Sequence, residues 1–186
     1  MSDLTLTKAF LFVMGNEDPE LTGKVITDID GGLTRFGIDS KSNPEALVCG
    51  FFTMPLDQAL QFAQNVFQDN YWCSMAGGSL QTGQIVISKM ADLVFNAGAK
   101  QGIKITQRAV NSFRTANKLK EDGICGAGTV AAINTFLDDS DVEALYSGIL
   151  EHGKVFYQEL ATENPAKFTP ELEAAWIQRL DKRPPV

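Results

Sequence analysis

The sequence predicts an α+β fold that is mainly α-helical, with one small β-hairpin and a helical C-terminal lobe. Three observations predict this fold. Apolar residues recur at helical spacing over much of the chain, beginning with residues 6–16. Residues 24–38 contain a double glycine between apolar residues, which is typical of a hairpin. Residues 84–97 are apolar on almost every face, which indicates a helix buried at the centre.

The remaining elements follow from local signals. The first helix should end near Glu17, because the next residue precedes a proline and therefore resists the α conformation. Residues 39–52 are expected to form a loop, and Thr53 is expected to cap the helix that follows. Gly98 should end the buried helix. Further helices are expected at residues 103–113, 129–137, 142–163 and 170–181.

The length of 186 residues and an apolar content of 44% suit one globular unit with a small appended lobe. We assign residues 1–100 to a part with the first helix, the hairpin and the central buried helix. Residues 101–186 then form a helical part that packs with the first as one unit. No apolar run approaches the roughly 20 residues of a membrane span. The N-terminus lacks the features of a signal peptide, so we expect synthesis in the cytoplasm.

Charge and composition exclude several functional classes. A net charge of −7 disfavours nucleic-acid binding, which relies on basic surface. Three cysteines without paired spacing argue against a disulfide framework, and His152 is the single histidine. A zinc site and a Ser-His-Asp system are therefore disfavoured. Carboxylates remain as acid and base groups, and neither a metal nor an organic cofactor is implied.

Carboxylates and a hydroxyl gather around the predicted hairpin. Its central stretch, residues 27–38, reads TDIDGGLTRFGI, and two glutamates precede it. Glycoside hydrolysis needs a proton donor and a group that orients water or stabilises the developing cation. The simpler interpretation is that acidic residues in a glycine-rich loop form solvated turns. The candidates are Glu17 or Glu20 as donor, Asp28 or Asp30 as second carboxylate, and Thr34 as the water-holding hydroxyl.

Several segments, taken in order, resemble glycoside hydrolase family 108, the muramidases of phages and prophages. Residues 12–17 (FVMGNE) resemble the end of that family's first helix, and residues 29–38 (IDGGLTRFGI) resemble its hairpin. The segment after Glu17 is longer here by a few residues, so counting from the helix selects Glu17 and counting from the glycines selects Glu20. Further similar segments are Tyr71-Trp72 and residues 91–98, 107–109, 122–129, 156–157 and 176–179.

The resemblance implies a lysozyme-like domain with a C-terminal segment of the peptidoglycan-binding type. It implies hydrolysis of the β-1,4 bond between N-acetylmuramic acid and N-acetylglucosamine. Glu17 would protonate the leaving oxygen, a role that suits a helix C-terminus because that end disfavours an anion. Asp28 and Thr34 would position water, with Glu20 and Asp30 as alternates. The candidate substrate-binding residues are Tyr71, Trp72, Asp92 and Asn96.

The implied partner is bacterial peptidoglycan. Without an export signal, delivery to the cell wall would depend on a holin, on a phage virion or on a secretion apparatus. Two other functions stay open. One is a non-catalytic peptidoglycan-binding or phage-tail structural protein, and the other is a lytic transglycosylase, which needs one acid and no water-holding partner.

Overall fold

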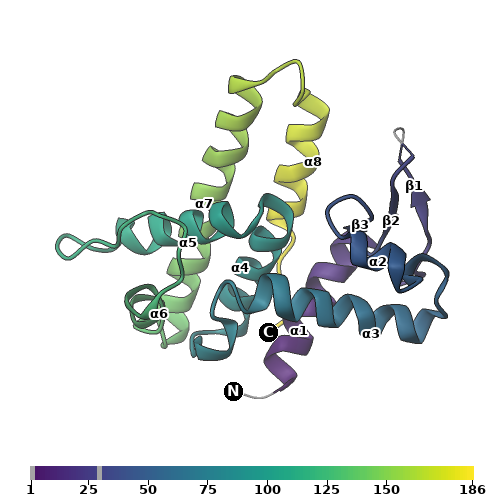
Figure 1. The fold of residues 1–186 in the computed structure, drawn as a ribbon. Coiled ribbons are helices and arrows are strands. Elements are labelled where there is room, and N and C mark those ends of the chain that lie inside the picture. The colour runs from purple at the N-terminus through teal and green to yellow at the C-terminus, as the bar shows by residue number, and fades with distance from the viewer. Residues whose placement is uncertain (1–2, 29–30) are drawn as a thin grey trace.

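The computed structural model describes residues 3–28 and 31–186, and the alternate carboxylate Asp30 lies outside the described residues. The described chain is mainly helical with one small antiparallel sheet, as predicted (Figure 1). Its α-helices are α1 (Asp3–Glu17), α2 (Pro44–Val48), α3 (Leu56–Val66), α4 (Gln84–Ala97), α5 (Ala99–Ser112), α6 (Ala127–Ile133), α7 (Asp139–Glu163) and α8 (Pro170–Asp181).

Helix α4 lies at the centre of the molecule and packs against α1, α5 and α7. Its residues from Ile85 to Val94 are all buried, which agrees with the apolar sequence on every face. Gly98 ends α4 with a φ of +85°, a conformation that favours glycine. The predicted central helix and its end are therefore confirmed.

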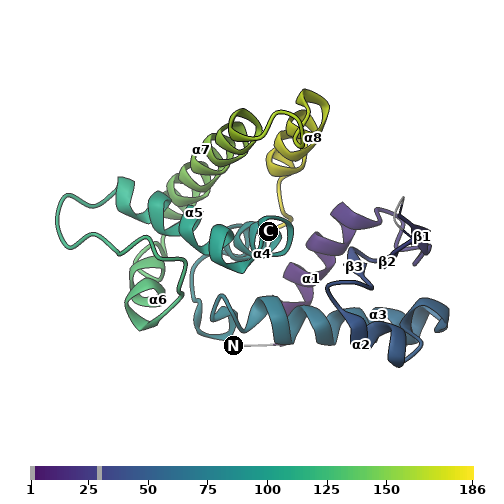
Figure 2. The ribbon, with the colours of Figure 1, turned by 45° about the horizontal axis from the view of Figure 1, so that its top comes forward.

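Two parts project from this centre on either side of a gap (Figures 1 and 2). Helices α7 and α8 form an antiparallel pair on one side, joined by a short turn. The sheet lies on the other side, together with α2 and α3. The chain after α8 then returns toward α4 and α1, so the C-terminal segment comes close to the first helix.

The sheet contains three short strands in the order β1 (Ile26–Thr27), β2 (Leu33–Arg35) and β3 (Ile38–Asp39). Both neighbouring pairs are antiparallel, and Thr34 on the central strand pairs with Ile26 on one side and Asp39 on the other. The predicted hairpin is confirmed, with β3 as an additional strand. This register places the Thr34 side chain in the middle of the sheet.

The segment expected to be a loop, residues 39–52, instead contains α2 and the start of a 3-10 helix, η1 (Phe51–Thr53). Thr53 therefore lies within η1 and does not cap α3. Buried Arg35 holds the end of this segment, because its guanidinium donates to the carbonyl oxygens of Phe51 and Met54, and also to that of Gly23, each at 2.8 Å. Burial lowers the pKa of Arg35, and these carbonyls compensate for the lost water.

None of the helices among residues 3–28 and 31–186 is both long enough and apolar enough to cross a membrane. The longest, α7, has 25 residues.

Close packing between α4 and α5 depends on Gly102. A Cβ atom at this position would lie 2.5 Å from the backbone nitrogen of Val94, and a backbone atom cannot rotate away from the clash as a side chain can. We therefore predict that Gly102→Ala lowers the free energy of unfolding by about 1–3 kcal/mol. Gly128→Ala in α6 is the matched control, because open space surrounds that position and alanine favours a helix. Urea denaturation measures both, and equal stability of the two variants would contradict the packing argument.

Candidate active site

Glu17 is the last residue of α1 and faces the sheet. The chain after it turns sharply, and the Asp18 carboxylate stabilises the turn by accepting from the backbone nitrogen of Gly23 at 2.7 Å. Gly37, with a φ of +70°, lies directly against Glu17. A Cβ atom there would lie 2.8 Å from the Glu17 carboxyl carbon, so glycine permits this close approach of the sheet.

Glu17 and Thr34 line the same cavity, which has a volume of about 220 Å³. The cavity is open on one side and lies between the end of α1 and the sheet. Asp28 reaches this place through Thr34, whose hydroxyl donates to the Asp28 carboxylate at 3.2 Å. Three of the predicted side chains are therefore brought together. Glu20 is exposed and does not line the cavity.

Arg179 from the C-terminal helix α8 contacts Glu17. Its Nη1 atom donates to Glu17 Oε1 at 2.5 Å, and its Nε and Nη2 atoms donate to Asp92 Oδ1 at 3.0 and 2.8 Å. The Asp92 side chain is only 3% exposed, and Asn16 donates a further hydrogen bond to it at 3.0 Å. One guanidinium thus joins the carboxylates of α1 and α4.

Electrostatics stabilise the charge on Arg179. Burial by itself would lower its pKa, but the negative charges of Asp92 and Glu17 and the hydrogen bonds to them outweigh burial and raise it. Arg179 is therefore a permanent cation at the floor of the site. An ion pair with this cation needs the carboxylate form of Glu17, whereas a proton donor must carry a proton.

Lys89 lies fully buried on α4, beneath the same network. Its ammonium group donates to the carbonyl oxygens of Leu180 and Lys182 at 2.8 and 2.7 Å, and it lies 3.9 Å from Asp92. These two carbonyls belong to the last turn of α8 and the residue beyond it. Lys89 therefore holds the end of α8 next to Arg179. Burial lowers the pKa of Lys89 to about 8, although the nearby Asp92 charge opposes this shift.

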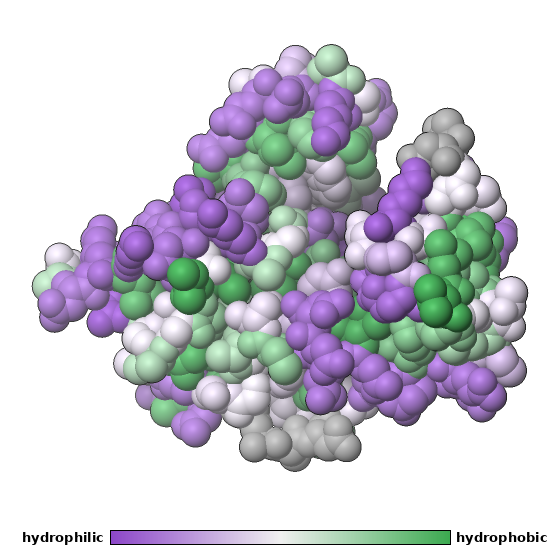
Figure 3. All heavy atoms as spheres, viewed as in Figure 1, coloured by the Kyte–Doolittle hydropathy of each residue, from purple (hydrophilic) through white to green (hydrophobic). Residues whose placement is uncertain are grey.

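A second cavity continues the site on the far side of Arg179. It has a volume of about 360 Å³ and is lined by Asn16, Asn96, Arg179 and further α8 residues, including Trp176. The space-filling view shows a notch between the α7–α8 pair and the sheet (Figure 3). The Glu17–Arg179 ion pair joins the two cavities, because Glu17 lines the first and Arg179 lines the second, and we call the two cavities together the cleft.

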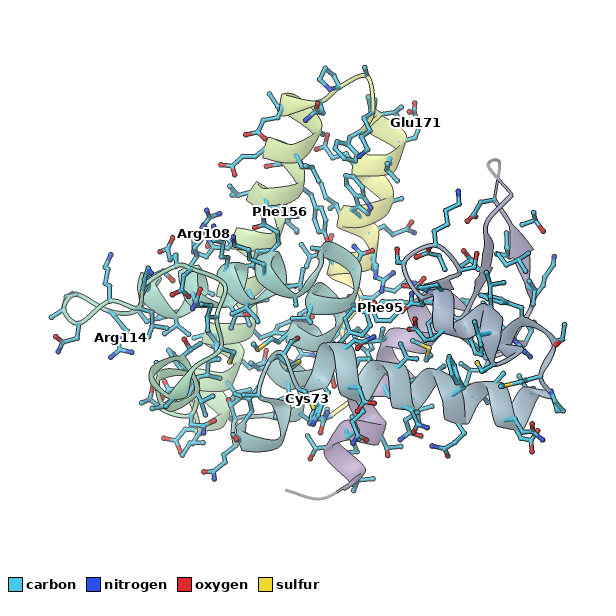
Figure 4. All side chains as sticks on the ribbon, in the orientation of Figure 1. Cys73, Phe95, Arg108, Arg114, Phe156 and Glu171 are labelled. Atoms are coloured by element: carbon cyan, nitrogen blue, oxygen red, sulfur yellow. The ribbon has the colours of Figure 1, made fainter. Side chains whose placement is uncertain are left out.

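The other predicted binding residues lie in different environments. Tyr71 is half-buried and contacts Phe95, which lies on α4 on the side of the sheet (Figure 4). Burial raises the pKa of Tyr71, and the charges of Asp39 and Glu17 add to the effect. Trp72 belongs to the core instead, where it packs against Gly77.

Asp92 and Asn96 have partners that the sequence did not indicate. The sequence offered both only as candidate substrate-binding residues. The partners of Asp92 lie on α1 and α8, and Asn96 donates to the Tyr157 hydroxyl of α7 at 2.7 Å. Asn96 still lines the second cavity. Asp92 is largely occupied by ion pairing and has little surface left for a ligand.

Sequence reasoning missed Arg179, Lys89 and Asn16. A lysine in a helix that is otherwise apolar on every face is a signal, because buried lysines need specific acceptors. Asn16 and Arg179 carried no such signal, because both lie near the end of a helix, where a polar residue is ordinary.

No protein-family model matches the sequence, and no curated protein sequence matches it. The solved structure of SagA from Brucella abortus is similar, with a TM-score of 0.60 and 19% sequence identity. The match covers 96% of this chain and 95% of that one. At this identity the comparison establishes the fold alone, and the fold is of the mainly α-helical, lysozyme-like α+β class.

Lys89 makes the stability depend on pH in a defined direction. Its folded-state pKa of about 8 lies below the ordinary value of 10.5, so the unfolded chain binds more protons between these values. Stability therefore rises with pH across this window, and falls as pH drops through about 8. We predict that, between pH 7.5 and 10, the free energy of unfolding of wild type rises by up to about 3 kcal/mol relative to that of Lys89→Met. Urea unfolding of both proteins at each pH measures this, and a constant difference would contradict it.

Proposed function

We propose that this protein is a peptidoglycan hydrolase, an N-acetylmuramidase that cleaves the β-1,4 bond between N-acetylmuramic acid and N-acetylglucosamine. The supporting observation is that Glu17 and Thr34 line one cavity and that Asp28 bonds to Thr34. A carboxyl group and a hydroxyl held by a second carboxylate are the groups that hydrolysis of a glycoside requires. The lysozyme-like fold and the motif resemblance to glycoside hydrolase family 108 support the same proposal.

In this proposal each side chain has a defined role. Glu17 donates its proton to the glycosidic oxygen as the bond to the muramic acid breaks. The Thr34 hydroxyl and the Asp28 carboxylate orient the water that attacks the anomeric carbon, and Asp28 accepts the proton that this water releases. Glu17 must therefore bind a proton before each turnover, and Arg179 keeps two hydrogen bonds to Asp92 when it does.

The cleft suits a glycan chain that passes over the ion pair. Its first cavity lies against the sheet, and the second offers amide side chains and the indole of Trp176. Amides match the acetamido groups of the sugars, and flat aromatic rings match their apolar faces. The substrate class is bacterial peptidoglycan, reached with the help of a holin, a virion or a secretion apparatus.

A second candidate is a non-catalytic peptidoglycan-binding or phage-tail structural protein. The observation that favours it is the ion pair between Glu17 and Arg179, because a paired carboxylate is not a proton donor. Such a protein would bind insoluble cell wall without releasing reducing sugars.

The proposal predicts that Glu17→Gln lowers hydrolysis of purified peptidoglycan at least about 100-fold, because an amide cannot donate the proton. Release of reducing ends measures the rate. Glu20→Gln is the matched control, since Glu20 is an exposed glutamate outside the cavity, and should retain wild-type activity. Loss of activity in Glu20→Gln alone would identify Glu20, and not Glu17, as the proton donor. Wild type that binds cell wall but releases nothing would favour the non-catalytic candidate.

Thr34→Val tests the water-holding role. Valine keeps the shape of threonine but cannot hold water or bond to Asp28, so kcat should fall about 10-fold or more while KM changes little. Thr27→Val on the exposed strand β1 is the control.

Product masses complete this test. The proposal predicts muropeptides with ordinary reducing ends. Full activity in both Thr34→Val and Asp28→Ala, with 1,6-anhydro sugars as products, would instead identify a lytic transglycosylase.

A further inference from the structure

A third cavity, of about 560 Å³, lies on the other side of α1 from the sheet. One wall is a face of α1 that carries Lys8, Leu11, Phe12 and Gly15, which are positions i, i+3, i+4 and i+7 of the helix. The opposite wall is the segment after α8, from Lys182 to Pro185. Gly15 leaves the floor open, because nothing lies within 4 Å of where its Cβ would be. We call this cavity the α1 groove.

The α1 groove is basic and apolar in a protein with a net charge of −7. Its charged lining consists of Lys8, Lys182 and Arg183, and no acidic side chain lines it. Arg183 is already paired with Glu143 of α7, and Lys8 donates to the carbonyl oxygen of Val186 at 3.2 Å. Lys182 is exposed, and among the described residues no ion pair to its side chain is found. A carboxylate-bearing ligand would complement this lining.

The groove is continuous with the cleft that holds Glu17. It shares Asn16 and Lys182 with the second cavity, and that cavity contains Arg179, the partner of Glu17. Lys8 lies eight residues before Asn16 on the same helix, an axial distance of about 12 Å at the helical rise of 1.5 Å per residue. A ligand attached to a sugar in the cleft can therefore extend along α1 into the groove.

We propose that the α1 groove binds the peptide stem of the peptidoglycan strand, with Lys182 and Lys8 facing its carboxylates. This inference rests on the proposed function, because it assumes that the glycan lies in the cleft. A stem of about four residues in extended form spans about 13 Å, which is close to the axial length from Asn16 to Lys8. The stem carries several free carboxylates and short apolar side chains. Leu11 and Phe12 would contact the apolar groups between the charges.

Charge reversal tests the groove. The variants are Lys182→Glu and Lys8→Glu, and Lys118→Glu in an exposed loop is the matched control. The probe is a synthetic stem tetrapeptide with its carboxylates free, and calorimetric titration gives its Kd. We expect each groove variant to weaken binding about 10-fold and the control to bind like wild type. Circular dichroism verifies that each variant is folded.

Turnover gives a second, independent readout. Peptidoglycan with intact stems and the same glycan stripped of its stems by an amidase are compared as substrates. The ratio of kcat/KM for the two should fall about 10-fold in Lys182→Glu and stay at its wild-type value in Lys118→Glu.

The two proposals fail in different ways. If wild type binds the tetrapeptide but hydrolyses neither substrate, the muramidase proposal is wrong and the proposal that the α1 groove binds the stem stands. Wild type that hydrolyses both substrates equally and does not bind the tetrapeptide would overturn the groove. Binding of anionic lipid vesicles without binding of the tetrapeptide would assign the groove to a membrane surface and also overturn it.

Discussion

The Arg179 guanidinium is the contact on which the arrangement of the cleft depends. It comes from the last turns of α8 and bonds to Glu17 at the end of α1 and to Asp92 in the middle of α4. These three helices are distant in the sequence, and 162 residues separate Arg179 from Glu17. Because the guanidinium is planar and presents several donors, one side chain can orient two carboxylates at once. The position of Glu17 relative to the sheet is therefore linked to the C-terminal helix.

The buried charges beneath the cleft depend on one another as hydrogen-bonding partners. Lys89, Asp92 and Arg179 are all largely buried, and each has hydrogen-bonding partners that replace water. Removing one member leaves an unpaired buried charge, which typically costs about 3–5 kcal/mol. In this network the ion pair with Arg179 needs Glu17 as a carboxylate, whereas the proposed reaction needs Glu17 with a proton. Asp92 remains as a partner for Arg179 when Glu17 takes up a proton, so the acid can be neutral without leaving Arg179 unpaired.

Local signals in the sequence were sufficient for most of the helices. The apolar pattern of α4 and Gly98 at its end predicted Gln84–Ala97, and the proline after Thr169 marked the start of α8. The prediction of a loop at residues 39–52 was wrong, and a distant contact holds the end of this segment. Arg35 bonds the carbonyls of Phe51 and Met54, and no local pattern in those residues reveals a partner 16 or 19 residues away.

The candidate site was predictable only in part, for the same reason. Glu17, Asp28 and Thr34 lie in one short stretch, so motif and spacing could select them. Arg179 of α8 could not be selected in this way, because it is distant from that stretch in the sequence. Trp72 was selected although it does not line the cleft. An aromatic residue next to Tyr71 suits a sugar-binding surface or the core, and the structure packs it in the core against Gly77.

A double-mutant cycle between Glu17 and Arg179 tests the central contact most directly. The free energy of unfolding is measured for wild type, Glu17→Ala, Arg179→Met and the double variant. A pair at 2.5 Å between side chains that are 20% and 14% exposed should show a coupling free energy of about 1–3 kcal/mol. Additive effects, with a coupling below about 0.3 kcal/mol, would mean that Arg179 does not hold Glu17 in place.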